Sequence, residues 1–107
     1  MKVEVLYIPD CPHHPRAVQE LRNVLLAEGI VEEIYEVAVR NSSAAKEFKF
    51  RGSPTIRING RDVAGESQEQ ELHALACRIY PGSQEAGVPP IEMIRRAVRK
   101  AREGESV

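Results

Sequence analysis

The sequence is poor in cysteine and in aromatic residues, and it lacks tryptophan altogether. Its two cysteines are too few for a disulfide scaffold or for a zinc site built from thiolates alone. No hydrophobic run reaches the roughly 18 residues that a membrane-spanning helix needs. A formal net charge of -1 gives no overall attraction for nucleic acid. We therefore expect neither a membrane nor a nucleic-acid partner.

What is present is the composition of one ordinary soluble domain. Hydrophobic residues make up 42% and charged residues 29% of the chain. We expect a single domain over residues 1–107, long enough to bury a core without cross-links. The charges of Lys2 and Glu4 come too early for a secretory signal peptide, so we expect a cytoplasmic protein. Widely separated thiols such as Cys11 and Cys77 are more often free than paired there.

Hydrophobic periodicity predicts that the first half of the chain alternates between strands and a helix. Alternating apolar residues predict a strand over Lys2–Ile8. Apolar residues at helical spacing over Ala17–Leu25, with Gly29 where a C-cap belongs, predict a helix. Cys11 would lie at the start of this helix. A second strand is predicted over Val31–Val39.

Turn-forming and helix-capping residues mark the boundaries of the helices and strands in the rest of the chain. Asn41–Ser43 supply caps for a short helix, and Ser53–Ile58 reads as a strand entered through a proline. Asn59-Gly60 is a strong hairpin signal, with a short return strand over Arg61–Ala64. Pro89-Pro90 opens a final helix. The apolar stripe of that helix is Ile91, Ile94, Ala97, Val98 and Ala101.

The segment Ser67–Tyr80 fits two structures. As a helix it would place on one face the apolar residues Leu72, Leu75, Ala76 and Ile79. As a strand it would place Leu75, Cys77 and Ile79 on one side instead. A free cysteine prefers burial, which favours the extended structure.

This order of elements, β-α-β-α-β-β-α, predicts an α/β fold with helices packed on the sheet. Two local signals fall within it: Cys11-Pro12-His13-His14 before the first helix, and Ser53-Pro54-Thr55 at the third strand. With the Asn59-Gly60 turn, they make the chain resemble the thioredoxin and glutaredoxin superfamily.

The resemblance implies a thioredoxin-like three-layer sandwich with a mixed sheet, and a cis Ser53–Pro54 bond next to Cys11. It implies Cys11, His14 and Pro54 as catalytic residues. It implies substrate contacts from Pro12, His13, Ser53 and Thr55. The second cysteine of the family's C-x-x-C motif is replaced here by His14.

The residues themselves also favour a reactive Cys11. The positive end of a helix dipole and a protonated histidine both stabilise a thiolate, and His14 is spaced to face back toward Cys11. A cysteine that merely packs at a strand end is the competing interpretation. Proline and histidine neighbours do not suit such a buried apolar site. Cys77 is either a remote second thiol or a small core residue, and the core role is favoured.

The leading hypothesis is therefore monothiol thiol–disulfide exchange through Cys11, with a protein or low-molecular-weight thiol as partner. Glutathione would be a co-substrate, and no other cofactor or resident metal is expected. One alternative is a soft-metal binder for mercury, copper or zinc, using Cys11 with His14 or Cys77. Another is a non-catalytic interaction module.

Basic residues gather on the final helix, and a nucleic-acid patch there is conceivable. They are Arg95, Arg96, Arg99, Lys100 and Arg102. No aromatic platform accompanies them. We expect a solvated face that complements the negative end of the helix dipole.

Overall fold

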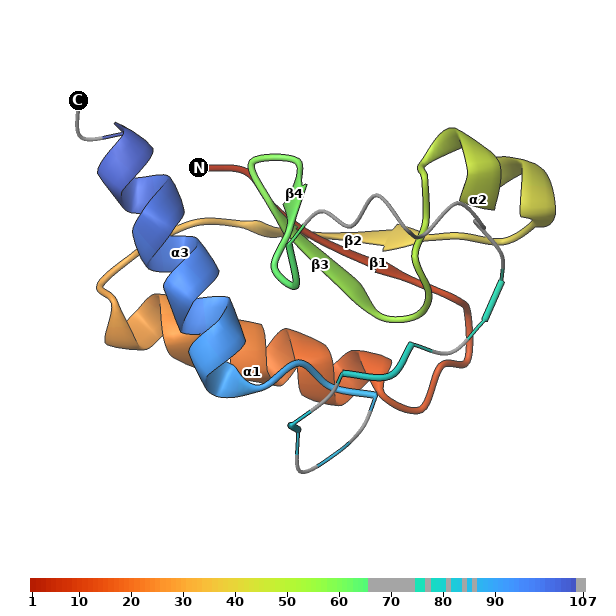
Figure 1. The fold of residues 1–107 in the computed structure, drawn as a ribbon, viewed down its shortest axis with the longest axis horizontal. Coiled ribbons are helices and arrows are strands. Elements are labelled where there is room, and N and C mark those ends of the chain that lie inside the picture. The colour runs from red at the N-terminus through yellow and green to blue at the C-terminus, as the bar shows by residue number, and fades with distance from the viewer. Residues whose placement is uncertain (66–74, 77, 81, 84, 86, 106–107) are drawn as a thin grey trace.

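The computed structural model describes residues 1–65, 75–76, 78–80, 82–83, 85 and 87–105. Strands and helices alternate in the described chain (Figure 1). In chain order they are β1 (Val3–Tyr7), α1 (His14–Ala27), β2 (Ile34–Ala38), α2 (Ser42–Glu47), β3 (Thr55–Ile58), β4 (Arg61–Asp62) and α3 (Ile91–Glu105). This is the order that the sequence predicts.

The strands form one four-stranded sheet in the order β2-β1-β3-β4. β1 pairs with β2 in parallel and with β3 antiparallel, so the sheet is mixed. β3 turns back into β4 through Asn59 and Gly60, whose φ angles of 53° and 80° are those that a tight hairpin requires. The α/β class, the mixed sheet and the hairpin turn are therefore confirmed.

Helices cover both faces of the sheet. Val3 and Val5 of β1 point into a core shared with α1 and α3. Leu6 points to the opposite face, where it joins Ala45 of α2 and Phe50 in a second, smaller core. Because successive strand residues face opposite ways, β1 contributes to both cores. The result is a sheet between two helical layers.

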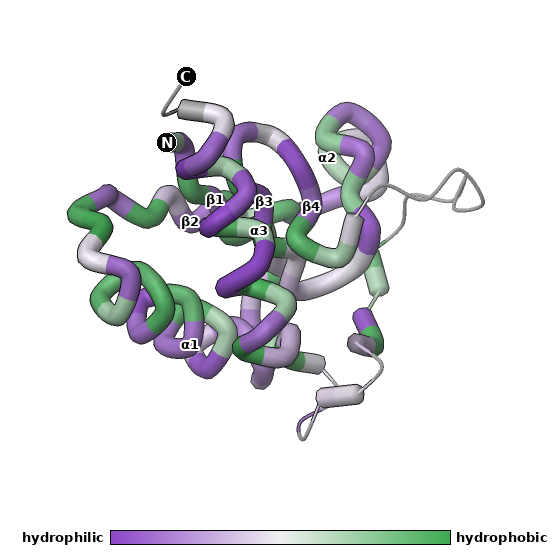
Figure 2. The backbone as a smooth tube through the Cα atoms, turned by 60° about the vertical axis from the view of Figure 1, so that its left-hand side comes forward, coloured by the Kyte–Doolittle hydropathy of each residue, from purple (hydrophilic) through white to green (hydrophobic). Residues whose placement is uncertain are grey.

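α1 is amphipathic, as its sequence predicts. The residues that it buries are Ala17, Val18, Glu20, Leu21, Val24 and Leu25. Figure 2 shows its tube changing between hydrophobic and hydrophilic colours along its length. Gly29, with φ of 68°, follows the C-cap Glu28 as expected. The start differs from the prediction: His13 is the N-cap, Pro15 lies in the first turn, and Cys11 precedes the helix.

The predicted second strand is too long at its beginning. Val31 lies outside β2 and is 98% exposed. β2 begins at Ile34 because that residue is paired with Val3, the first strand residue of β1. Apolar alternation alone does not show where pairing with the partner strand begins. The cap of the next helix is as predicted, since the Asn41 side chain accepts a hydrogen bond from the Ala44 N–H at 2.8 Å.

Most of Ser67–Tyr80 lies outside the described residues, and so does Cys77. Its described residues, 75–76 and 78–80, belong to no helix or strand. Two backbone hydrogen bonds attach them to the sheet: the Ser53 N–H donates to the Ala76 carbonyl at 2.8 Å, and the Arg78 N–H donates to the Ser53 carbonyl at 3.0 Å. This part of the chain therefore lies alongside the entry to β3.

A membrane-crossing helix would need greater length and apolarity than any helix in the described residues has.

Candidate functional site

Cys11 lies in the turn between β1 and α1. Its N–H donates to the Ile8 carbonyl at 3.0 Å, and its carbonyl accepts from the His14 N–H at 3.3 Å. Asp10 adopts a left-handed conformation with φ of 68°, which aspartate tolerates better than most residues. The cysteine is partly buried and its thiol is free. The turn therefore fixes the Cys11 backbone through both its N–H and its carbonyl, while the thiol forms no disulfide.

Ser53 connects this turn to the beginning of β3. Its buried hydroxyl accepts the Ile8 N–H at 3.0 Å. Ile8 in turn accepts the Cys11 N–H, so two hydrogen bonds lead from Cys11 to Ser53. The Ser53–Pro54 peptide bond is cis. The structure thus brings the two predicted motifs, distant in sequence, to one end of the sheet.

The Pro54 carbonyl and the Thr55 hydroxyl form hydrogen bonds with other residues of the protein. The Pro54 carbonyl accepts the Tyr80 hydroxyl at 2.5 Å. The buried Thr55 hydroxyl donates to the Gly52 carbonyl at 2.6 Å and accepts from Arg78 at 3.3 Å. These contacts, together with the Ser53 backbone bonds, place residues 78–80 against the motif.

His14 is fixed against the sheet. Its ring stacks on Tyr7 with centroids 3.7 Å apart, and its Nε2 lies 2.6 Å from Glu36 Oε1. Its link to Cys11 is the backbone bond already described. The sequence spacing that suggested a thiolate partner gave no sign of Tyr7 or Glu36, because both lie on strands.

His13 faces a different part of the chain. Its Nδ1 lies 3.0 Å from Glu85 Oε1. A Cβ added at Gly87 would lie only 2.2 Å from the His13 ring, so the Gly87 backbone packs directly on the imidazole. Pro12, between Cys11 and His13, is exposed. The predicted group Cys11–His14 therefore spreads over a turn whose two histidines contact different parts of the chain.

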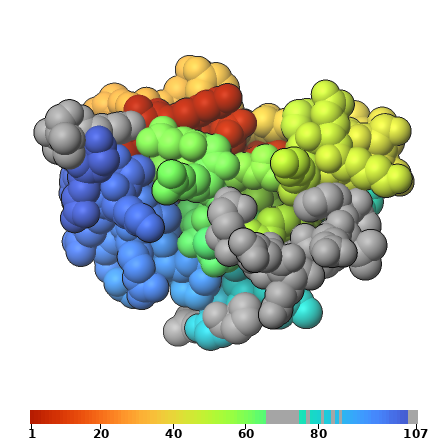
Figure 3. Space-filling view, turned by 45° about the horizontal axis from the view of Figure 1, so that its top comes forward, coloured from red at the N-terminus to blue at the C-terminus, as the bar shows by residue number. Residues whose placement is uncertain are grey.

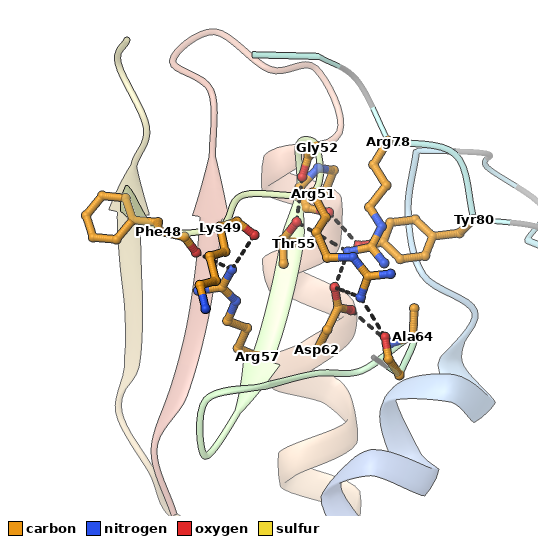
Figure 4. A network of polar contacts seen from close by, with 12 residues as sticks. Phe48, Lys49, Arg51, Gly52, Thr55, Arg57, Asp62, Ala64, Arg78 and Tyr80 are labelled. Atoms are coloured by element: carbon orange, nitrogen blue, oxygen red, sulfur yellow. Dashed lines mark hydrogen bonds and ion pairs between the residues drawn. The ribbon is translucent and has the colours of Figure 1, made fainter. Parts of the chain in front are cut away.

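A buried polar network adjoins this site, and the sequence gave no signal for it (Figure 4). The Asp62 side chain is 2% exposed and pairs with Arg78 at 2.6 Å and with Arg51 at 3.2 Å. The Arg78 guanidinium also lies 4.6 Å from the centre of the Tyr80 ring. Burial raises the pKa of the Tyr80 hydroxyl well above its ordinary value. The network holds residues 78–80 against β3 and β4.

The described residues contain no group of three or more histidine, cysteine, aspartate or glutamate side chains arranged to hold a metal ion. Cys77 and His73 are not among them. Comparison with known proteins adds no relative: no protein family, curated protein or solved structure matches this chain.

Proposed function

We propose that this protein is a monothiol thiol–disulfide exchange protein with a thioredoxin-like fold and glutaredoxin-like chemistry, and that Cys11 is its nucleophile. The observation that carries the proposal is the connection of Cys11 through Ile8 to the buried hydroxyl of Ser53. It links the backbone of the Cys11 turn to the Ser53-Pro54-Thr55 segment at one end of the sheet, and Cys11 is a free cysteine. That is the pairing of motifs on which the sequence resemblance rests.

The reaction needs only thiols and a disulfide. The Cys11 thiolate attacks one sulfur of a partner disulfide, and the second sulfur leaves as a thiolate that takes a proton from water. The product is a mixed disulfide on Cys11. A second thiol, from glutathione or a protein, then attacks the partner sulfur and releases the Cys11 thiolate. The outside thiol is required because His14 occupies the position of a resolving cysteine.

Local structure supports the thiolate form of Cys11. The turn that carries it leads into the positive end of α1, whose dipole favours a nearby negative charge. The sulfur itself has no disulfide partner. Reactive cysteines are typically partly exposed and lie near positive potential, and the first of these properties is met by Cys11.

The test is reduction of a glutathione mixed disulfide, coupled to glutathione oxidation. Cys11→Ser is expected to abolish turnover, whereas Cys77→Ser serves as the matched control and retains it. Equal rates for the wild type and Cys11→Ser would refute the proposal. Loss of turnover in Cys77→Ser as well would show a dithiol route in place of the monothiol route.

A non-catalytic interaction module is the second candidate, and one observation favours it. Both backbone hydrogen-bonding groups of Ser53 are taken by Ala76 and Arg78. A partner polypeptide that pairs beside Pro54 would meet this occupied edge. Iodoacetamide labelling of the native protein separates the two candidates. Labelling of Cys11 faster than that of an ordinary free cysteine supports exchange, and labelling at or below that rate supports the interaction module.

The soft-metal alternative receives no comparable support. Zinc sites use three or four protein ligands, and Cys11 with His14 supplies only two. The Nε2 atom of His14 is already within hydrogen-bonding distance of Glu36. Metal binding thus stays a prediction that rests on Cys77, outside the described residues.

A further inference from the structure

The basic residues of α3 divide into two sets with different surroundings. Arg99 binds both carboxylate oxygens of Glu28, at 2.9 and 3.1 Å, and Arg102 binds the same carboxylate at 2.7 Å. Arg95 pairs with Glu92 one turn earlier. The side chains of these three arginines therefore form ion pairs within the protein.

Arg96 and Lys100 belong to the second set. They lie one turn apart on α3, and Arg61 of β4 faces the same pocket. Within the described chain, none of these three exposed side chains has a carboxylate partner at ion-pair distance. Three positive charges thus converge on one place without compensation.

The place on which they converge is a pocket of about 640 Å³ between the β3–β4 hairpin and α3, which we call the hairpin–helix pocket. Figure 3 shows the hairpin in green directly beside α3 in blue. Its apolar lining comes from Ile58, Val63, Met93, Ala97 and Ala101. Two alanines one turn apart, Ala97 and Ala101, line the helix side of the pocket, and their small side chains leave space against the hairpin.

The pocket also contains one carboxylate, that of Asp62. It does not cancel the positive potential, because both Arg51 and Arg78 pair with it. Volume and lining match those of small-molecule sites, which are concave, mainly apolar and supplied with a few polar groups that fix orientation. A ligand here would meet an apolar floor and a cationic rim.

We propose that the hairpin–helix pocket binds a small anionic amphiphile, in which a carboxylate or phosphate group is joined to a short hydrocarbon chain. The anion pairs with Arg61, Arg96 and Lys100, while the hydrocarbon covers the apolar floor. This site is separate from Cys11. The pocket adjoins Ile58, which pairs with Val3 at the beginning of β1, whereas Cys11 follows the end of β1.

The test uses octanoate and octyl phosphate as probes and measures binding by calorimetry and by amide chemical-shift changes. Octylamine supplies the same chain with the opposite charge, and acetate and inorganic phosphate supply the anions without the chain. We expect saturable binding of at least one octyl anion, with shift changes confined to the hairpin and α3. The three control compounds are expected to bind at least about tenfold more weakly.

Two protein variants locate the site. Arg96→Gln with Lys100→Gln is expected to weaken binding of the octyl anion by about tenfold or more. Arg95→Gln is the matched control for the single variant Arg96→Gln, because each removes one positive charge from neighbouring positions of α3 and Arg95 lies outside the pocket. Ala101→Leu fills the pocket without changing its charge and is expected to weaken binding similarly, with thermal unfolding measured to confirm that it folds.

Comparison of the affinities of octanoate and octyl phosphate shows which anion the hairpin–helix pocket prefers. Absence of binding by both octyl anions at millimolar concentration would overturn the proposal. So would equal affinity for octylamine, or equal weakening of binding by Arg95→Gln and by Arg96→Gln. None of these outcomes depends on Cys11, so they leave the exchange proposal untouched.

Discussion

Tyr7 and His14 lie face to face, with their ring planes inclined by only 5°. Tyr7 is the last residue of β1 and His14 is the first residue of α1, so the stack closes the turn that carries Cys11. The hydrogen bond from His14 to Glu36 extends this attachment to β2. The conformation of the Cys11 turn therefore depends on a side chain that sequence spacing linked only to the thiol.

His14→Gln is expected to lower the free energy of unfolding by about 1 kcal/mol, because it removes the aromatic stack and weakens the contact with Glu36. Urea denaturation measures this change. Tyr7→Leu is the matched variant, since it removes the stack and keeps the imidazole. A slower alkylation of Cys11 in His14→Gln alone would show that the imidazole acts on the thiolate, whereas equal effects in both variants would show a purely structural role.

Ser53→Ala is expected to cost about 1–3 kcal/mol, because it leaves the Ile8 N–H without its acceptor in a partly buried position. The Cys11 turn loses its connection to β3, so the rate of thiol–disulfide exchange should fall as well. Both quantities are measured against Ser43→Ala, which changes an exposed serine of α2. Ser53→Ala that matches this control in stability and rate would contradict the role given to the hydroxyl.

Asp62→Asn is expected to destabilise the protein by about 3–5 kcal/mol, because two guanidinium groups lose the charge that compensates them in a buried site. The side chains of Arg51 and Arg78 are only 11% and 9% exposed. Chemical denaturation tests this, with Asp10→Asn as an exposed control that should stay within about 0.5 kcal/mol of the wild type. A loss no larger than that of the control would show that the guanidiniums find other partners.

The raised pKa of Tyr80 predicts a loss of stability at alkaline pH. The unfolded chain releases the tyrosine proton near the ordinary pKa of 10.0, whereas burial keeps the folded hydroxyl protonated to higher pH. Above about pH 10 the unfolded state binds fewer protons, so the free energy of unfolding falls as the pH rises. Tyr80→Phe should flatten this slope, and Tyr35→Phe, at an exposed site, should retain it. Equal slopes in the two variants would exclude Tyr80 as the cause.

The lowered pKa of Glu28 predicts a loss of stability at acidic pH. The hydrogen bond from Arg99 is the largest cause of the shift, and the charges of Arg99 and Arg102 add to it. The contribution is present above the ordinary pKa of 4.5 and disappears as the pH falls through the lower folded value. Glu28→Gln should reduce the acid slope in thermal unfolding, particularly at low salt. Glu33→Gln, an exposed change before β2, should leave it in place.

The sequence determined the features that depend on a few neighbouring residues. Asn41 caps α2, Gly29 follows the end of α1, and Asn59-Gly60 forms the hairpin turn. Each follows from a local dihedral or hydrogen-bonding preference, and hydrophobic periodicity supplies the order of strands and helices. The α/β class then follows from that order, because few arrangements bury all the apolar faces.

Only the tertiary structure decided where pairing stops and which partners the polar side chains take. Val31 lies outside β2 because β1 begins at Val3, which pairs with Ile34. Glu28 and Arg99 are 71 positions apart, and no local pattern shows that they meet. The same contrast between local sequence and tertiary structure applies to Cys11. The sequence identified the thiol, whereas its connection through Ile8 to Ser53 arises from strands that meet only in the folded sheet.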